Sequence, residues 1–300
     1  MANGNVITTH GLTKRYGSSI TAVDALDLEV HRGEVFGFLG PNGAGKTTTL
    51  RMLLGLIRPT AGSAVVAEHR PGDPKGLRRI GSLVESPAFY PYLSGRENLK
   101  IMSDYAGVSH TRVDAALEEV DLADRAKDRF GTYSMGMKQR LAVAAALIKD
   151  PEVMILDEPT NGLDPQGVVE MRALIRRLGS GNRTVMLSSH LLNEVQQISD
   201  RVAIIRKGKL VAQGTVQELR GESAIVVRVT PVDAARRQLD RMLGAAAVTA
   251  VDGTLRLSVD PNKAADINEA LVGAGIKVSE LRAVERTLEE VFLTLTGEAA

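Results

Sequence analysis

The sequence predicts an α/β protein: a core with a mainly parallel β-sheet, a helical subdomain inserted into that core, and a small α+β domain at the C-terminal end. Three short runs are continuously apolar rather than alternating between apolar and polar residues: residues 35–39, 153–156 and 184–187. Such runs are typical of strands buried on both faces of a parallel sheet. Residues 166–178 have helical spacing and lie between the last two runs. This order predicts a βαβ unit.

The first of these runs leads into a glycine-rich loop and then a helix. Residues 35–39 end at Gly40, and a helical pattern starts at Lys46 and continues to Ile57. A continuous apolar run, a loop rich in glycine and a 3.6-residue periodicity predict strand, loop and helix in turn.

Residues from about 87 to 150 are predicted to form the helical subdomain. Ser94 and Glu97 have the spacing of a capping box at the start of one helix. Residues 113–120 and 138–149 have the patterns of two more helices. We expect this part to be inserted into a larger domain that spans residues 1–220.

Residues 221–300 are predicted to form an accessory α+β domain. Strands are expected at 225–230, 247–251, 254–259 and 276–281, and helices at 232–243, 262–272 and 288–295. Asp252-Gly253 separates the second and third strands, which is a strong signal for a tight hairpin. The order βαββαβ favours a ferredoxin-like domain.

Composition excludes several kinds of function. The 300 residues include no cysteine, so disulfides, thiolate metal sites and cysteine nucleophiles are excluded. A formal net charge of +1 argues against a large surface for nucleic acid, and we expect no nucleic-acid partner. No signal peptide is visible at the N-terminus, and no apolar run approaches the about 20 residues that cross a bilayer. Any membrane role is expected to be peripheral.

The segment Gly40-Pro-Asn-Gly-Ala-Gly-Lys-Thr47 matches the phosphate-binding P-loop pattern. Its glycines let backbone N–H groups turn toward the phosphates, and the following helix adds a positive dipole. Lys46 would neutralise phosphate charge, and the Thr47 hydroxyl would ligate Mg²⁺. The residues expected to bind ATP here are Gly40, Pro41, Asn42, Gly43, Ala44, Gly45, Lys46, Thr47 and Thr48. A chance glycine-rich turn is a negligible alternative at this place between strand and helix.

Asp157 and Glu158 end an apolar strand. Alone, such a pair is more often a solvated strand end. With a P-loop upstream, Asp157 can hold Mg²⁺ and Glu158 can polarise the attacking water. The sequence therefore predicts a P-loop NTPase core.

Further motifs resemble the ABC ATPase family over about residues 6–220. Tyr133-Ser-Met-Gly-Met-Lys-Gln-Arg140 looks like the signature motif of that family, and Asp157-Glu158-Pro159 follows at a suitable distance. Asn161-Gly-Leu-Asp164 is similar to its D-loop, His190 to its switch histidine, and Lys14-Arg-Tyr-Gly17 to the segment whose aromatic residue stacks on adenine.

The resemblance implies that two such domains face each other head to tail and enclose ATP between them. Ser134 and Gly136 would then contact the ATP of the partner, a second copy or a paralogue. Tyr16 would stack on adenine, and Lys46, Glu158 and His190 would serve hydrolysis. Two ATPase subunits would join integral membrane permease subunits at the cytoplasmic face of the membrane, as a peripheral motor for transport.

Each of these residues also has a plainer interpretation. His190 alone would more often be a surface or capped histidine. Tyr16 alone would usually be a half-buried packing residue. Ser134 could simply cap the helix that follows, which is compatible with binding a phosphate there.

The sequence departs from the family pattern in its signature and its Q-loop. Met135 and Met137 stand where the family usually has Gly and Gln, and Glu85 stands where it has Gln. A carboxylate can also ligate Mg²⁺, so Glu85 joins Thr47 and Asp157 as an expected metal ligand. This combination resembles the exporters that remove bacitracin and lantibiotics, which implies export of a drug, antibiotic or peptide.

Phe89-Tyr-Pro-Tyr92 holds three of the ten Phe and Tyr residues of the chain. Such a cluster could dock a partner, and the resemblance places the permease here. A small core under the helical subdomain is an equal alternative.

A different class of function is an ABC-type ATPase that acts on ribosomes or DNA. Those that act on ribosomes carry two nucleotide-binding domains, and this chain has one P-loop. Those that act on DNA separate P-loop and signature by long coiled coil, and here the two lie close in sequence. A P-loop kinase or GTPase has no use for the signature segment.

Overall fold

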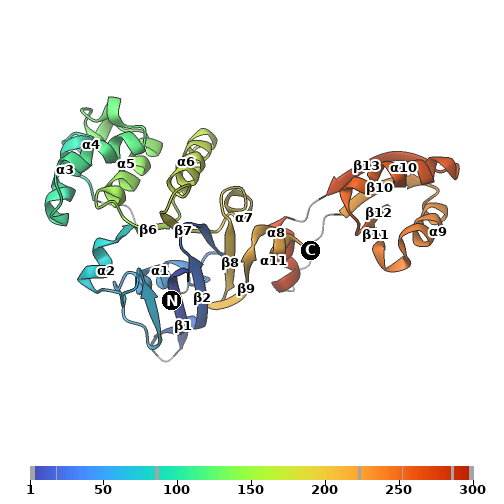
Figure 1. Ribbon diagram of the computed structural model, residues 1–300, viewed down its shortest axis with the longest axis horizontal. Helices are drawn as coiled ribbons and strands as arrows, with labels where there is room; N and C mark the ends of the chain where they lie inside the picture. The colour runs from blue at the N-terminus through green and yellow to red at the C-terminus, as the bar shows by residue number, and fades with distance from the viewer. Residues whose placement is uncertain are drawn as a thin grey trace. The chain divides into compact units, whose positions relative to one another are not determined.

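The computed structural model describes residues 4–17, 19–84, 88–221, 224–251, 253–284 and 287–296. The chain divides into two compact units, Met1–Val216 and Gln217–Ala300. Figure 1 labels their helices and strands and colours the chain by residue number.

A six-stranded sheet forms the centre of the first unit. Its strands are β3 (Val35–Leu39), β5 (Ile80–Leu83), β6 (Val153–Asp157), β7 (Thr184–Ser189), β8 (Arg201–Arg206) and β9 (Lys209–Thr215), in the order β5-β6-β7-β3-β8-β9. Neighbours are parallel except β8 and β9, which are antiparallel. Every residue of β3 and β7 is buried, so the continuous apolar runs correctly predicted central strands.

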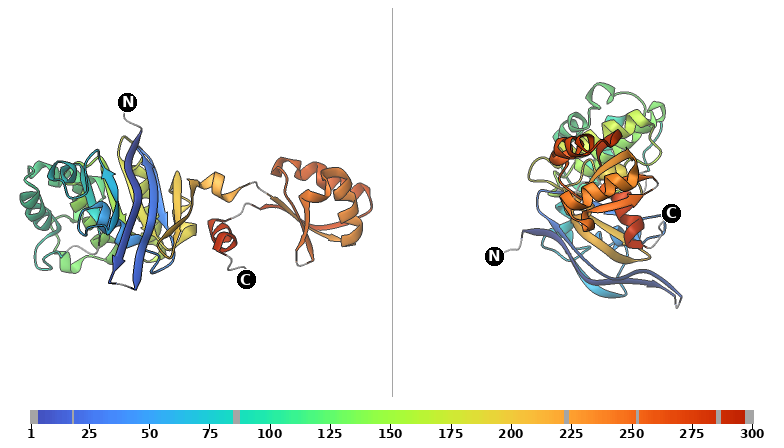
Figure 2. Two further views of the ribbon diagram at one scale, coloured as in Figure 1. Left: turned by 90° about the horizontal axis from the view of Figure 1, so that it is seen from below. Right: turned by 90° about the vertical axis from the view of Figure 1, so that its right-hand side faces the viewer.

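A second, antiparallel sheet was not predicted from the sequence. It consists of β1 (Asn5–Tyr16), β2 (Ile20–His31) and β4 (Ala61–Val66), in the order β2-β1-β4. The pairing of β1 with β2 extends from Asn5 and His31 to Tyr16 and Ile20, and the two strands lie side by side along the unit in Figure 2. The signal was present, because buried Leu26, Leu28 and Val30 alternate with exposed residues in β2.

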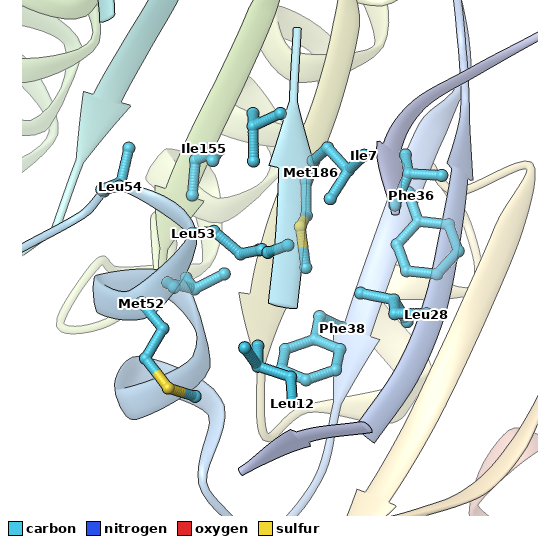
Figure 3. Packing of buried hydrophobic residues seen from close by; sticks show 14 of the residues in the cluster. Ile7, Leu12, Leu28, Phe36, Phe38, Met52, Leu53, Leu54, Ile155 and Met186 are labelled. Atoms are coloured by element: carbon cyan, nitrogen blue, oxygen red, sulfur yellow. The ribbon is translucent and has the colours of Figure 1, made fainter. Parts of the chain in front are cut away.

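The main core lies between the two sheets and includes helix α1 (Lys46–Leu53). Figure 3 shows Leu12 and Leu28 from the antiparallel sheet, Phe38 from β3 and Leu53 from α1 meeting there. The predicted helix was too long: α1 ends at Leu53 rather than near Ile57. Gly55 follows with φ 73°, a conformation that ends helices and that side chains disfavour.

The helical subdomain contains α3 (Gly95–Ala106), α4 (Thr111–Glu119) and α5 (Met135–Leu147), with two 3₁₀ turns, η1 (Ala123–Arg125) and η2 (Phe130–Thr132). The capping box of Ser94 and Glu97 is present, as predicted. Helix α5 begins at Met135, three residues before the expected start, because Ser134 caps it. A Cβ on Gly81 of β5 would lie 2.2 Å from Ala146 O, so only glycine lets α5 approach this edge of the sheet so closely.

The other helices described in the first unit are α2 (Pro74–Arg78), α6 (Pro165–Leu178) and α7 (Leu192–Val195). Helix α8 (Val216–Arg220) begins at the last residue of this unit. Helix α6 occupies the predicted place, with Asp164 as its N-cap and Pro165 at its first position.

The second unit contains a four-stranded antiparallel sheet and two longer helices. In chain order it consists of β10 (Ala224–Thr230), α9 (Val232–Leu243), η3 (Ala245–Ala247), β11 (Val248–Val251), β12 (Thr254–Leu257), η4 (Pro261–Lys263), α10 (Ala264–Gly273), β13 (Lys277–Val284) and α11 (Leu288–Thr296). The strand order is β11-β12-β10-β13. Val251 pairs with Thr254 across the predicted hairpin, whose residue Asp252 lies outside the described residues. Buried residues such as Ile225, Leu239 and Leu271 form a separate core.

None of the helices in the described ranges is long and apolar enough to cross a membrane.

Candidate functional site

The loop between β3 and α1 is shaped by glycine. Gly45 has φ 105°, and a Cβ at this position would lie 2.4 Å from Ala22 O in β2. A larger residue would therefore push the loop away from β2 and out of its left-handed conformation. The loop thereby delivers Lys46 and Thr47 to the first turn of α1, where backbone N–H groups have no partner within the helix.

A polar hollow of about 410 Å³ lies over this loop. Its lining residues are Ala22, Asn42, Gly43, Gly45, Lys46, Thr47, Thr48, Glu158, Asn161 and His190. The structure thus brings together Lys46 from the P-loop, Glu158 after β6 and His190 after β7, the three residues that the resemblance assigned to hydrolysis.

Lys46 is the cation of this hollow. Its side chain is 6% exposed, and Nζ donates to Gly40 O at 2.7 Å and lies 3.2 Å from Glu158 Oε1. A buried ammonium group with these two oxygen partners is held at the mouth of the loop. An entering phosphate can take over the pairing that Glu158 supplies, because it offers the same kind of anionic oxygen.

Glu158 is fixed from two sides. Its backbone N–H donates to Ser188 Oγ at 3.0 Å, and His190 Nδ1 lies 2.8 Å from Glu158 Oε2. Its backbone is in the left-handed region, with φ 48°, which is uncommon for a residue with a side chain and is concentrated at functional sites. The carboxylate that could polarise water therefore has a defined position between Lys46 and His190.

Ser188 links the two acids at the end of β6. Its hydroxyl donates to Asp157 Oδ1 and accepts from the N–H of Glu158, and the residue is fully buried. The sequence analysis assigned no role to Ser188. A serine at the end of the otherwise apolar run of β7 was the signal that could have found it.

Asp157 and Thr47 line a second hollow together with Glu158 and Asn161. A carboxylate and a hydroxyl that share one hollow are hard oxygen donors of the kind that Mg²⁺ prefers. The arrangement therefore fits the expected metal. The third expected ligand, Glu85, lies outside the described residues.

Tyr16 lies apart from the hollow over the P-loop. It ends β1, its side chain is 43% exposed, and Lys14 Nζ lies 5.1 Å from the ring centroid. The ring thus lies at the end of the middle strand of the antiparallel sheet and is partly open to solvent.

The signature residues line a hollow of their own. Ser134 caps α5 by accepting from Met137 N at 3.3 Å. Ser134 and Gly136 then share a hollow with Gly162 and Asp164, and neither lines the hollow over the P-loop. Within one chain, the signature residues therefore lie in a different hollow from the P-loop residues.

Phe89 fits one of the two interpretations of the aromatic cluster, a small core, and Tyr90 and Tyr92 fit the other, an exposed surface for a partner. The Phe89 ring packs edge-on against Phe130 at 5.1 Å between centroids, as in a small core. Tyr90 and Tyr92 are 44% and 66% exposed, with centroids 5.8 Å apart. Buried Asn98 in α3 holds this loop, because it accepts from Tyr90 N at 2.8 Å and donates to Tyr90 O at 3.1 Å.

A buried strand, a glycine loop, a helix with a buried lysine and a neighbouring strand that ends in two acids define a nucleoside-triphosphate-binding protein of the P-loop class. The family model that matches the chain is described as ABC transporter and covers residues 23–161. The bacitracin transport ATP-binding protein of Bacillus licheniformis is 42% identical over 97% of this chain and 97% of its own length. The chain therefore belongs to the ABC transporter family and is one of its ATP-binding ATPases, as the resemblance implied.

Other relatives agree with this assignment. The daunorubicin resistance ATP-binding protein of Streptomyces coeruleorubidus is 39% identical over 97% of this chain and 96% of its length. A solved ATP-binding subunit of an ABC transporter superposes with a TM-score of 0.63 at 27% identity, over 72% of this chain and 92% of that one. A dimeric ATP-binding cassette bound to ADP and phosphate has the same fold, with a TM-score of 0.63 at 24% identity over 70% of this chain and 99% of that one.

Proposed function

We propose that this chain powers the export of a drug, antibiotic or peptide through a separate membrane permease, from the cytoplasmic face of the membrane. The observation that carries the proposal is the joint presence of Lys46, Glu158 and His190 in one hollow over the P-loop. Support for the cargo class comes from relatives named for bacitracin transport, daunorubicin resistance and lantibiotic transport.

In the proposed site, Gly40, Pro41, Asn42, Gly43, Ala44, Gly45, Lys46, Thr47 and Thr48 bind the phosphates of ATP, and Tyr16 stacks on the base. Lys46 neutralises the β- and γ-phosphate charge. Glu158 accepts a proton from the attacking water, and His190 holds the Glu158 carboxylate in place. The contact of His190 Nδ1 with Glu158 Oε2 supports this division of roles.

Thr47 and Asp157 would hold Mg²⁺, with Glu85 as a third ligand predicted from the sequence, and the ion would neutralise charge on the phosphates. Ser188 orients Asp157 for this role by donating to its carboxylate. Fixing a ligand through a neighbouring hydrogen bond is a general way to tune a metal site.

A head-to-tail dimer of two such subunits is part of the proposal. Ser134 and Gly136 lie in a hollow separate from Lys46, which supports a site that a second copy or a paralogue completes. The N-terminus of α5, where Ser134 is the cap, has the positive dipole end that suits a phosphate.

Tyr90 and Tyr92 are the proposed contact for the permease. Both rings are exposed, and exposed neighbouring tyrosines are typical of binding surfaces. Asn98 holds the loop through the backbone of Tyr90, and Phe89 holds it through its contact with Phe130, so the rings of Tyr90 and Tyr92 stay available for a partner.

We also propose residues 1–220 as the nucleotide-binding domain, with its helical subdomain at about 87–150, and residues 221–300 as an accessory ferredoxin-like domain. The element order β10, α9, β11, β12, α10, β13 and the strand order β11-β12-β10-β13 support the last assignment. None of the residues assigned to ATP belongs to this domain.

Transport is tested by expressing the chain with the permease gene beside it in a host that is sensitive to peptide antibiotics. The wild-type pair should raise resistance to at least one such compound, and Lys46→Ala should abolish that gain, because the phosphates lose their main neutralising charge. ATP hydrolysis without any resistance, transport or permease binding would contradict the proposed export.

A further inference from the structure

The signature segment carries an exposed apolar side chain that the proposed ATP contacts do not use. Met135 stands between Ser134 and Gly136 at the first position of α5, and its side chain is 57% exposed. It lines two hollows: the one that also contains Thr47, Asp157 and Glu158, and the one that contains Ser134 and Gly136. Met135 thus forms part of the wall between the chain's own acids and the surface proposed for the partner's ATP.

Across that wall, Met135 faces Gly162 in the D-loop of the same chain. Its terminal methyl carbon, Cε, lies 3.7 Å from the position that a Cβ on Gly162 would take. Gly162 carries no Cβ, so the methyl group faces the bare backbone of Gly162 across a small gap, and the two residues line both hollows together. Gly162 has φ 77°, a conformation in which a residue with a side chain would be strained.

The D-loop leads from this contact directly to the catalytic acid. Asn161 N donates to Glu158 O at 3.0 Å, which closes the turn between the two residues. Asn161 also lines the hollow over the P-loop together with Lys46 and His190. A displacement of Gly162 would therefore be passed through one short turn to the chain's own ATP site.

We propose that Met135 is a positioning residue that couples the two ATP sites of the dimer. This inference rests on the proposed head-to-tail arrangement, in which Ser134 and Gly136 bind the partner's ATP. Binding there orders the N-terminus of α5, the Met135 methyl group presses on Gly162, and the turn that carries Glu158 takes its hydrolytic position. A contact couples two sites when its free energy differs between their states.

A methionine suits this place for two reasons. The side chain is long enough to reach from α5 to the D-loop, whereas the glycine usual in the family has none. Its thioether is also flexible and apolar, so it can follow Gly162 through a small movement without breaking a hydrogen bond.

The test uses the full-length chain and four variants: Met135→Ala, Met135→Leu, Met135→Gln and the control Met242→Ala. Met242 is a comparably exposed methionine, 43% exposed, in α9 of the second unit. For each protein we would measure the ATP dependence of hydrolysis and the binding of a fluorescent ATP analogue to dilute protein. Thermal unfolding would confirm that each variant is folded.

Met135→Ala should lower the Hill coefficient of hydrolysis from about 2 to about 1 and reduce kcat at least about fivefold, the lower range of allosteric coupling. Binding of the analogue to dilute protein should change less than about twofold, because Met135 does not line the hollow over its own P-loop. Met135→Leu should restore most of the cooperativity, and Met135→Gln, which keeps the length but removes the apolar end, should not.

Three outcomes would overturn the inference. Wild-type cooperativity and kcat in Met135→Ala, or a failure of Met135→Leu to restore them, would exclude an apolar contact as the link. A Glu158→Gln chain that binds ATP but stays monomeric would instead remove the proposed dimer, and the inference with it. If the dimer forms normally and substitutions at Met135 do not change hydrolysis, the inference is wrong but the proposed dimer is not.

Discussion

At the scale of single residues, the ATP site depends on a side chain that touches no nucleotide in the proposed mechanism. Ser188 is buried, donates to Asp157 and accepts from the backbone of Glu158. Both acids therefore owe their positions partly to one hydroxyl. Ser189, its neighbour, is equally buried, but its hydroxyl accepts from Leu191 N instead.

Ser188→Ala should reduce kcat for ATP by about 10- to 100-fold, the usual effect of removing a group that orients a metal ligand. The concentration of Mg²⁺ needed for half-maximal rate should rise, while the KM for ATP should change little, because the P-loop is untouched. Steady-state kinetics with Mg²⁺ titration provide the measurement, and Ser189→Ala is the control. Equal losses in the two variants would show that the strand end, rather than the link to the acids, matters.

At the scale of elements, the loop that carries Tyr90 and Tyr92 depends on helix α3. Asn98→Ala removes the side chain that accepts from Tyr90 N and donates to Tyr90 O and Ser94 O. Unfolding should become easier by about 1–3 kcal/mol because these backbone groups lose partners. ATP binding should stay within about twofold, and co-purification with the permease should fall as the tyrosines lose their fixed position.

A second variant, Tyr92→Ala, distinguishes an effect on permease binding from an effect on stability. Tyr92→Ala should weaken co-purification without lowering the thermal midpoint, since the side chain is 66% exposed. If both variants still bind the permease as the wild type does, the proposed docking surface is wrong.

Ion pairs at the ends of β5 and β6 make stability depend on pH. Arg79 donates to both oxygens of Glu152, at 2.6 and 2.7 Å, and these bonds lower the pKa of Glu152 from its ordinary 4.5. Arg32 contributes further. Because the folded pKa is the lower one, the ionised carboxylate stabilises the fold above pH 4.5, and this stabilisation is lost as the pH falls through the folded pKa.

Glu152→Gln should therefore lower the free energy of unfolding by about 0.5–1 kcal/mol at neutral pH, since the carboxylate is 39% exposed and partly screened. The difference from the wild type should shrink as the pH drops below the ordinary value. Urea unfolding at about pH 7 and about pH 4 measures both. A difference that grows on acidification would contradict the assigned sign.

The sequence predicted those elements whose patterns are local. Strand β3 and helix α9 have the predicted ends, because a continuous apolar run and a 3.6-residue period need no partner to be recognised. The end of α1 was missed because Gly55 packs on Gly72, a contact between segments distant in sequence. The motif residues that line the hollow over the P-loop could be picked out one by one from the sequence. The link through Ser188 and the division of Phe89 from its neighbouring tyrosines could not, because they depend on tertiary packing.

At the scale of the whole molecule, each unit has its own core. The buried cluster around α1 and β3 draws on strands from β1 to β8, and the second cluster draws only on residues from Ile225 onward. Two separate cores predict that the first unit can fold when the second is absent.

Truncation after Gly221 should therefore leave equilibrium binding of ATP within about twofold of the full chain. Dimerisation or the rate of hydrolysis should change if the second unit is the proposed accessory domain. Fluorescent-nucleotide titration and size-exclusion chromatography of the truncated chain provide the measurements. A folded truncation that no longer binds ATP would place part of the nucleotide site beyond residue 221.

The proposed shared site makes its sharpest prediction for Glu158→Gln. This change keeps the shape of the side chain and removes the charge that accepts the proton, so hydrolysis should slow at least about 100-fold. ATP should still bind at Lys46, and two ATP molecules held between two chains should favour the dimer by mass action. Size-exclusion chromatography with light scattering should then show a dimer in Mg-ATP and a monomer without nucleotide. A monomer at saturating Mg-ATP, in a protein that demonstrably binds ATP, would contradict the head-to-tail site.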